Sequence, residues 1–111
     1  MVERLLGRGD RVTVVDDLST GDTANLANAT ASFGERLDVV VGRVSDVIED
    51  VATSRSFDAI YHLAAAVGVQ LGVDRPIHTI ETNIHETASV LAVAARNSTR
   101  ILIASTSEVY G

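Results

Sequence analysis

The chain has 111 residues, enough for one compact domain and too few for two. Apolar residues make up 46% of it and charged residues 22%, a balance typical of a soluble globular protein. The net charge of −6 disfavours nucleic-acid and membrane partners, and the absence of cysteine excludes disulfides and thiolate metal sites. No apolar run or signal-peptide pattern indicates a membrane span or export, so we expect a cytoplasmic protein.

Short β-branched runs alternate along the chain with longer stretches that carry apolar residues at helical spacing. This alternation predicts an α/β fold with a parallel sheet. The runs are apolar nearly throughout, as expected when helices cover both faces of the sheet. The predicted strands are residues 11–15, 37–41, 57–63 and 100–104.

Helices are predicted between these strands. Asp22 can cap a short helix that carries Leu26 and Phe33, and Ser45 or Asp46 can cap another. The longest helix begins near residue 74, with a proline in its first turn. One apolar stripe, the pattern of a helix that packs against a core, is formed there by Ile77, Ile80, Ile84, Ala88, Leu91 and Ala95.

The two ends predict that more sequence belongs to this domain. Residues 2–6, followed by Gly7 and Gly9, are typical of the last turns of a helix with a glycine C-cap. After the strand at 100–104 there is no helix to cover it. We therefore expect a chain that is truncated at both ends.

Ligands of open α/β sheets bind beyond the carboxyl ends of the strands. Asp16 and Asp17 follow the first strand, where a carboxylate can accept hydrogen bonds from dinucleotide ribose hydroxyls and repel a 2′-phosphate. From the residues alone, an ordinary polar strand end is an equal alternative, because no glycine-rich loop precedes them. Asp46, after the second strand, is either a helix cap or an acceptor for the adenine edge.

The other two strands also end in informative residues. Small side chains at 64–66 allow a flat ligand to approach the backbone, or simply let a helix pack on the sheet. His62 is typical of a strand end, and His78 and His85 lack a third donor, so we predict no metal site. The hydroxyls and carboxylate at 105–108 either support acid–base chemistry or form a turn.

Five segments follow one another along the chain, namely VVDDLSTG (14–21), GRVSD (42–46), YHLAA (61–65), TN (82–83) and STSEVYG (105–111). In this order they resemble the extended short-chain dehydrogenase/reductase enzymes that modify nucleotide sugars, a group of epimerases, dehydratases and UDP-glucuronate decarboxylases. The resemblance implies a Rossmann-type, doubly wound parallel sheet with strand order 3-2-1-4-5. This chain would lack the first strand with its glycine-rich loop and the C-terminal substrate-binding part, which leaves a gap between the strands at Arg11 and Phe57.

NAD is the cofactor that the resemblance implies, held by residues 1–111 as part of an NAD-binding domain. Asp16 would bind the adenosine ribose, and Asp46 and Val47 would meet the adenine. Residues 63–65 would form a wall along the phosphates and the nicotinamide ribose, and Asn83 would steady this wall from the long helix. The full set of implied cofactor-binding residues is Asp16, Asp17, Ser19, Thr20, Gly21, Asp46, Val47, Leu63, Ala64, Ala65, Asn83 and Ser105.

The active-site hydroxyl of the family falls on Thr106, with Ser107 and Glu108 beside it. By the same resemblance Tyr110 would not be the catalytic tyrosine, which would belong to a Tyr-x-x-x-Lys motif beyond Gly111. The triplet at 106–108 resembles UDP-glucuronate decarboxylases, whereas residues 64–76 resemble epimerases, so both reactions stay open.

The resemblance further implies a UDP-sugar substrate, a 4-keto-sugar intermediate and a homodimer at full length. Two readings from other classes remain. The chain could be a non-catalytic nucleotide-binding module, or an inactive gene fragment.

Overall fold

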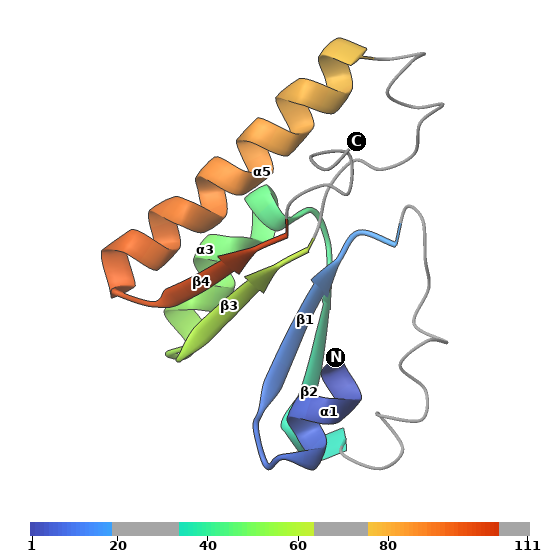
Figure 1. Cartoon of the computed structure of the whole chain (residues 1–111), viewed down its shortest axis with the longest axis vertical. Coiled ribbons are helices and arrows are strands. Elements are labelled where there is room, and N and C mark those ends of the chain that lie inside the picture. Colours follow the sequence, from blue (N-terminus) through green and yellow to red (C-terminus); the bar gives the residue numbers. More distant parts are fainter. Residues whose placement is uncertain (19–33, 64–75, 105–111) are drawn as a thin grey trace. The chain divides into compact units, whose positions relative to one another are not determined.

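The computed structural model describes residues 1–18, 34–63 and 76–104 (Figure 1). It contains two compact units, residues 1–43 and 44–111, each of which is described by itself. The helix predicted after Asp22, with Leu26 and Phe33, lies outside the described residues.

The first unit contains helix α1 (Val2–Gly7), strand β1 (Val12–Asp16), a short 3₁₀ helix η2 (Gly34–Arg36) and strand β2 (Leu37–Val41). The two strands are parallel, from Val12 opposite Leu37 to Asp16 opposite Val41. Leu6 of α1 is fully buried and forms the core with Leu37. The half-buried side chains packed around these two are Val2, Val12, Val14 and Val39.

Helix α1 ends in the glycine cap that the sequence predicts, at Gly9 rather than Gly7. Gly9 has a φ of 102°, a conformation that glycine adopts without a Cβ clash. Its N–H donates to the Leu6 carbonyl at 3.0 Å, and the Asp10 N–H donates to the Leu5 carbonyl at 3.1 Å. These two bonds form a Schellman motif that turns the chain from the helix into β1.

The second unit contains α3 (Val44–Ser54), β3 (Ala59–His62), α5 (Pro76–Asn97) and β4 (Arg100–Ile103). Strands β3 and β4 are parallel, from Ala59 opposite Arg100 to His62 opposite Ile103. The long helix α5 contacts both strands and packs along α3 (Figure 1). No helix within the described ranges is long and apolar enough to cross a membrane.

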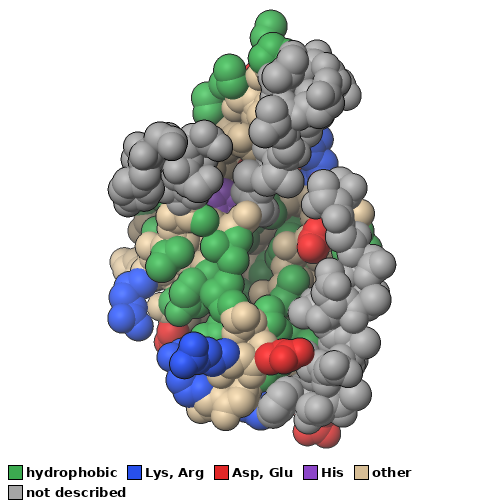
Figure 2. All heavy atoms as spheres, turned by 45° about the vertical axis from the view of Figure 1, so that its right-hand side comes forward, with side chains coloured by type: hydrophobic (Ala, Val, Ile, Leu, Met, Phe, Trp, Pro, Cys, Tyr) green, Lys and Arg blue, Asp and Glu red, His purple; other side chains and the backbone are tan. Residues whose placement is uncertain are grey.

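The four strands form two separate parallel pairs, β1–β2 and β3–β4. Among the described residues, one side of the β3–β4 pair is open to water, since the register partners Tyr61 and Leu102 are both exposed. Figure 2 likewise shows hydrophobic side chains open on the surface of the molecule.

Helix α5 begins at Pro76, as predicted, but it buries a different face from the predicted stripe. Ile77, Ile80 and Ile84 of that stripe are 71%, 57% and 63% exposed. Glu86, Val90, Val93 and Ala94 are buried instead. These four also follow helical spacing, and the small Val and Ala side chains among them allow close packing. The sequence of α5 therefore carries two apolar faces. The face with the larger side chains, which the sequence predicts to pack against the core, is the exposed one.

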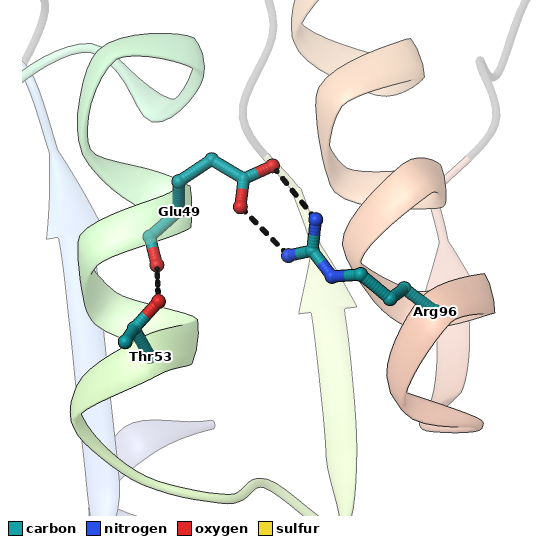
Figure 3. A network of polar contacts seen from close by, with 3 residues as sticks. All are labelled: Glu49, Thr53 and Arg96. Carbon is teal, nitrogen blue, oxygen red and sulfur yellow. Dashed lines mark hydrogen bonds and ion pairs between the residues drawn. The ribbon is translucent and has the colours of Figure 1, made fainter.

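An exposed ion pair links α3 and α5 (Figure 3). Arg96 Nη2 donates to Glu49 Oε2 at 2.7 Å, and Thr53 Oγ1 donates to the Glu49 backbone carbonyl at 2.7 Å. The hydrogen bond from Arg96, followed by its positive charge, lowers the pKa of Glu49. Because both side chains face water, the pair fixes geometry more than it stabilises the fold.

His62, at the end of β3, is buried. Its Nε2 atom lies 3.1 Å from Thr87 Oγ1 of α5 at hydrogen-bond distance. Burial disfavours the charged imidazolium and lowers the pKa of His62, while the nearby Glu86 carboxylate opposes this shift.

A pair of adjacent substitutions tests which face of α5 is buried. Val90→Ala should lower the free energy of unfolding by about 2 kcal/mol, because it removes two buried methyl groups. Leu91→Ala should cost about 1 kcal/mol or less, since Leu91 is 42% exposed. Urea denaturation measures both values. A larger loss for Leu91→Ala would mean that the helix buries the face predicted from the sequence.

The buried His62 should make stability depend on pH in a defined direction. Its pKa in the folded state lies below the value of 6.5 for the unfolded chain, so the unfolded state binds the proton first as pH falls. This contribution to stability is complete above pH 6.5 and is lost as pH falls from there through the folded-state pKa. NMR titration of the His62 ring protons measures that pKa directly. A value at or above 6.5 contradicts the expectation.

Candidate functional site

The carboxyl end of β1 holds the first group of predicted site residues. Asp16 is the last residue of the strand, and its backbone carbonyl accepts the Gly42 N–H at 3.0 Å. Its side-chain Oδ1 accepts the Leu18 N–H at 2.8 Å, which closes a tight turn. Leu18 has a φ of 62°, in the left-handed region that a leucine rarely adopts. Strain of this kind is typical of functional turns.

The geometry of Asp16 fits the role predicted for it. The residue is exposed, and a carboxylate has acceptor capacity beyond its one bond to Leu18. It can therefore accept hydrogen bonds from the hydroxyls of a ribose beyond the strand end. Asp17 is exposed beside it and adds a second negative charge. The continuation of this turn, with Ser19, Thr20 and Gly21, lies outside the described residues.

The start of α3 holds the second group. The helix begins at Val44, so Ser45 and Asp46 lie inside its first turn and the prediction that either caps the helix is wrong. The cap comes instead from Glu86 on α5. Glu86 Oε2 accepts the Ser45 N–H at 2.7 Å, and Oε1 accepts the Ser45 hydroxyl at 2.9 Å. Asp46 is left exposed in the first turn, with Val47 half-buried behind it.

Sequence reasoning missed Glu86. A carboxylate in the middle of a long helix is most often a solvent-exposed residue, and the predicted apolar stripe turned this position away from the core. The signal that could have found it is its helical spacing from Val90, Val93 and Ala94. A charged residue on such a face is buried and must be paired.

The end of β3 holds the third group. Leu63 follows the strand and is 51% exposed, whereas Asn83 is half-buried on α5. Among the residues described, no three His, Asp or Glu side chains gather where they could hold a metal ion. The predicted residues that lie outside the described ranges are Ala64, Ala65, Ser105, Thr106, Ser107 and Glu108.

Within the second unit, two consecutive residues of α5 tie two predicted cofactor-binding segments together. Glu86 holds the start of α3, next to Asp46. Thr87 contacts His62 at the end of β3, next to Leu63. In the first unit, Asp16 and Asp17 lie at the carboxyl end of β1.

Curated relatives match the whole of this chain. UDP-glucuronic acid decarboxylase 1 of Arabidopsis thaliana is 37% identical over 111 residues, which are 100% of this chain and 24% of that protein. UDP-N-acetyl-alpha-D-glucosaminuronate decarboxylase of Bacillus cytotoxicus is 31% identical over the same length, 33% of that protein. The chain thus spans about a quarter to a third of the relatives it matches.

Solved structures match the fold. UDP-glucose 4-epimerase from Bifidobacterium longum, in complex with NAD⁺ and UDP, aligns over 99% of this chain and 34% of its own, with a TM-score of 0.88 and 26% identity. The DesIV dTDP-glucose 4,6-dehydratase from Streptomyces venezuelae, with NAD and DAU bound, aligns over 99% of this chain and 36% of its own. Its TM-score is 0.82 and its identity 33%.

These matches confirm the predicted α/β, Rossmann-type fold and the resemblance to the short-chain dehydrogenase/reductase enzymes of nucleotide-sugar metabolism. The family model described as GDP-mannose 4,6 dehydratase matches residues 1–111. The chain therefore belongs to the GDP-mannose 4,6-dehydratase family.

Proposed function

We propose that the protein that carries this chain is an NAD-dependent enzyme that decarboxylates a UDP-linked uronic acid through a 4-keto intermediate. The observation that carries the proposal is the match of the whole chain, at 37% identity, to a UDP-glucuronic acid decarboxylase. The triplet Thr106-Ser107-Glu108 supports the same reaction, since it resembles the triplet of those enzymes.

Residues 1–111 form part of the NAD-binding domain in this proposal. Asp16 receives the adenosine ribose, and its exposed carboxylate at the strand end fits that role. Asp46 and Val47 meet the adenine at the start of α3. Leu63 and Asn83 belong to the wall along the phosphates and the nicotinamide ribose. The other residues assigned to the cofactor are Asp17, Ser19, Thr20, Gly21, Ala64, Ala65 and Ser105.

NAD, when bound, supplies the acceptor for the hydride of the sugar C4 and later returns it. The chain's own residues act on the protons. Thr106 holds the C4 oxygen through its hydroxyl. Once C4 is a ketone, the C6 carboxylate is β to it, so the C5–C6 bond can break and its electron pair moves to the C4 oxygen. CO₂ leaves, and Glu108 delivers the proton that C5 then takes up, with Ser107 beside it.

A second candidate reaction is 4-epimerisation of a UDP-sugar. The Bifidobacterium longum epimerase supports it, because it shares the fold at a TM-score of 0.88. Residues 64–76 support it as well, since they resemble epimerases more than decarboxylases. In that reaction hydride returns to the opposite face of C4, and no proton transfer at C5 is needed.

We also propose that the protein is a homodimer that binds neither nucleic acid nor membranes. The exposed row of Ile77, Ile80 and Ile84 on α5 is an apolar surface of the kind that subunit interfaces bury. The net charge of −6 disfavours phosphate backbones and anionic lipid.

The intact protein should bind NAD more tightly than NADP, because Asp16 and Asp17 place negative charge where a 2′-phosphate would lie. Asp16→Ala should weaken NAD binding about 10- to 100-fold, which corresponds to the loss of a hydrogen bond to a charged group. It should also reduce the ratio of the NAD affinity to the NADP affinity. Calorimetry measures both affinities. The control is Glu35→Ala. Glu35 is an exposed carboxylate that precedes β2 and therefore lies at the opposite end of that strand from its carboxyl end, so this change should alter neither affinity. Tighter NADP binding by the unmutated protein would contradict the proposal.

Glu108→Gln in the intact protein should separate oxidation from the later step. Formation of the 4-keto sugar and NADH should stay nearly intact, while release of the decarboxylated product slows by about 10²-fold or more. Thr106→Ala should instead slow oxidation itself. Single-turnover experiments that follow NADH absorbance and product separately measure the two steps.

The substrates for this experiment are UDP-glucuronate and UDP-glucose. Pentose product from UDP-glucuronate supports the decarboxylase, and inversion of UDP-glucose supports the epimerase. Loss of the NADH signal in Glu108→Gln would show that the division of roles between Thr106 and Glu108 is wrong.

A further inference from the structure

The buried carboxylate of Glu86 forms two hydrogen bonds with one residue at the start of α3. Its Oε2 accepts the Ser45 backbone N–H at 2.7 Å, and its Oε1 accepts the Ser45 hydroxyl at 2.9 Å. Glu86 is only 6% exposed. The two bonds come from different atoms of Ser45, so they restrict both the position and the rotation of the first turn of α3.

The energetics make this contact hard to replace. A buried carboxylate is costly unless it is hydrogen-bonded and faces positive charge. The free N–H groups and the positive dipole end of α3 supply both. Removal of the carboxylate leaves the Ser45 N–H without its partner, and the first turn of α3 can then shift or fray.

The next residue of α5 forms a second tether, to a different segment. Thr87 Oγ1 lies 3.1 Å from His62 Nε2, at the end of β3. The two tethers therefore hold different segments. Glu86 holds the side of Asp46, and Thr87 holds the side of Leu63.

We infer that Glu86 is a positioning residue for adenine recognition, because it fixes the first turn of α3 so that Asp46 faces the adenine edge. This inference rests on the proposed function, in which Asp46 accepts a hydrogen bond from the adenine C6 amino group. The Thr87 tether gives no such selectivity, since it supports the wall beyond β3 and not the adenine edge.

The experiment compares two dinucleotides on the intact protein. Nicotinamide hypoxanthine dinucleotide has an oxygen in place of the C6 amino group and a proton on N1, so at C6 it presents an acceptor to Asp46 instead of a donor. The unmutated protein should bind NAD on the order of tenfold more tightly than this analogue. Asp46→Asn should abolish most of that ratio, which tests the proposed function by itself.

Glu86→Ala should reduce the ratio to about twofold or less. Glu86→Gln, which keeps an acceptor for the Ser45 N–H, should restore most of it. The matched control is Glu81→Ala, an exposed carboxylate on the same helix, which should keep the full ratio. Thr87→Val should weaken the binding of both dinucleotides equally and leave the ratio of their affinities unchanged. Calorimetric titration gives the affinities, and thermal unfolding of each variant reports its stability.

Each outcome decides the inference. If Glu86→Ala lowers the melting temperature and keeps the ratio, Glu86 is structural only and the inference is wrong. If Thr87→Val abolishes the ratio as well, the effect is general loosening and the inference is again wrong. Where Glu86→Ala does not fold, Ser45→Ala removes the hydroxyl bond alone and should lower the ratio in part, and an unchanged ratio there overturns the inference. A missing ratio in the unmutated protein would overturn the proposed adenine site itself, and the inference with it.

Discussion

In the second unit the buried carboxylate of Glu86, on α5, caps the start of α3, a helix to which it does not belong. Helix α3 has no cap of its own at Ser45 or Asp46, so its first N–H groups need an acceptor from elsewhere. Glu86 supplies that acceptor from α5, and the exposed pair of Glu49 and Arg96 joins the same two helices further along. The two helices are thus joined by a part-buried and an exposed contact, and salt weakens the exposed contact much more than the part-buried one.

The sequence predicts the fold well because local signals and the βαβ rhythm agree. All four strands are found within two residues of their predicted bounds, and α5 begins at the predicted proline. Pro76 and Gly9 act through backbone geometry alone, so the helix start and the helix end that they predict do not depend on what packs against them. The order of the motifs then identifies the family, because five weak segments in one order are far more specific than any one of them.

The sequence does not predict contacts that form between distant elements. Helix α5 has two faces that are both apolar, and only its packing against α3 and the strands decides which is buried. The same packing turns Glu86 inward, where its carboxylate accepts the Ser45 N–H. Ser45 therefore lies inside the first turn of α3 and is not its N-cap. For Asp16 the position at a strand end was predictable, but the turn through Leu18 that engages one of its oxygens was not.

The division of the described strands into two pairs has a consequence for the backbone. Within residues 1–18, 34–63 and 76–104 every strand has a neighbour on one side only. Each pair therefore presents rows of amide and carbonyl groups along its outer sides, over ladders of five residues in β1–β2 and four in β3–β4. Such rows are templates for strand addition. Because the parallel partner already sets their pleat and register, the positions of the amide and carbonyl groups that a joining strand would meet are fixed.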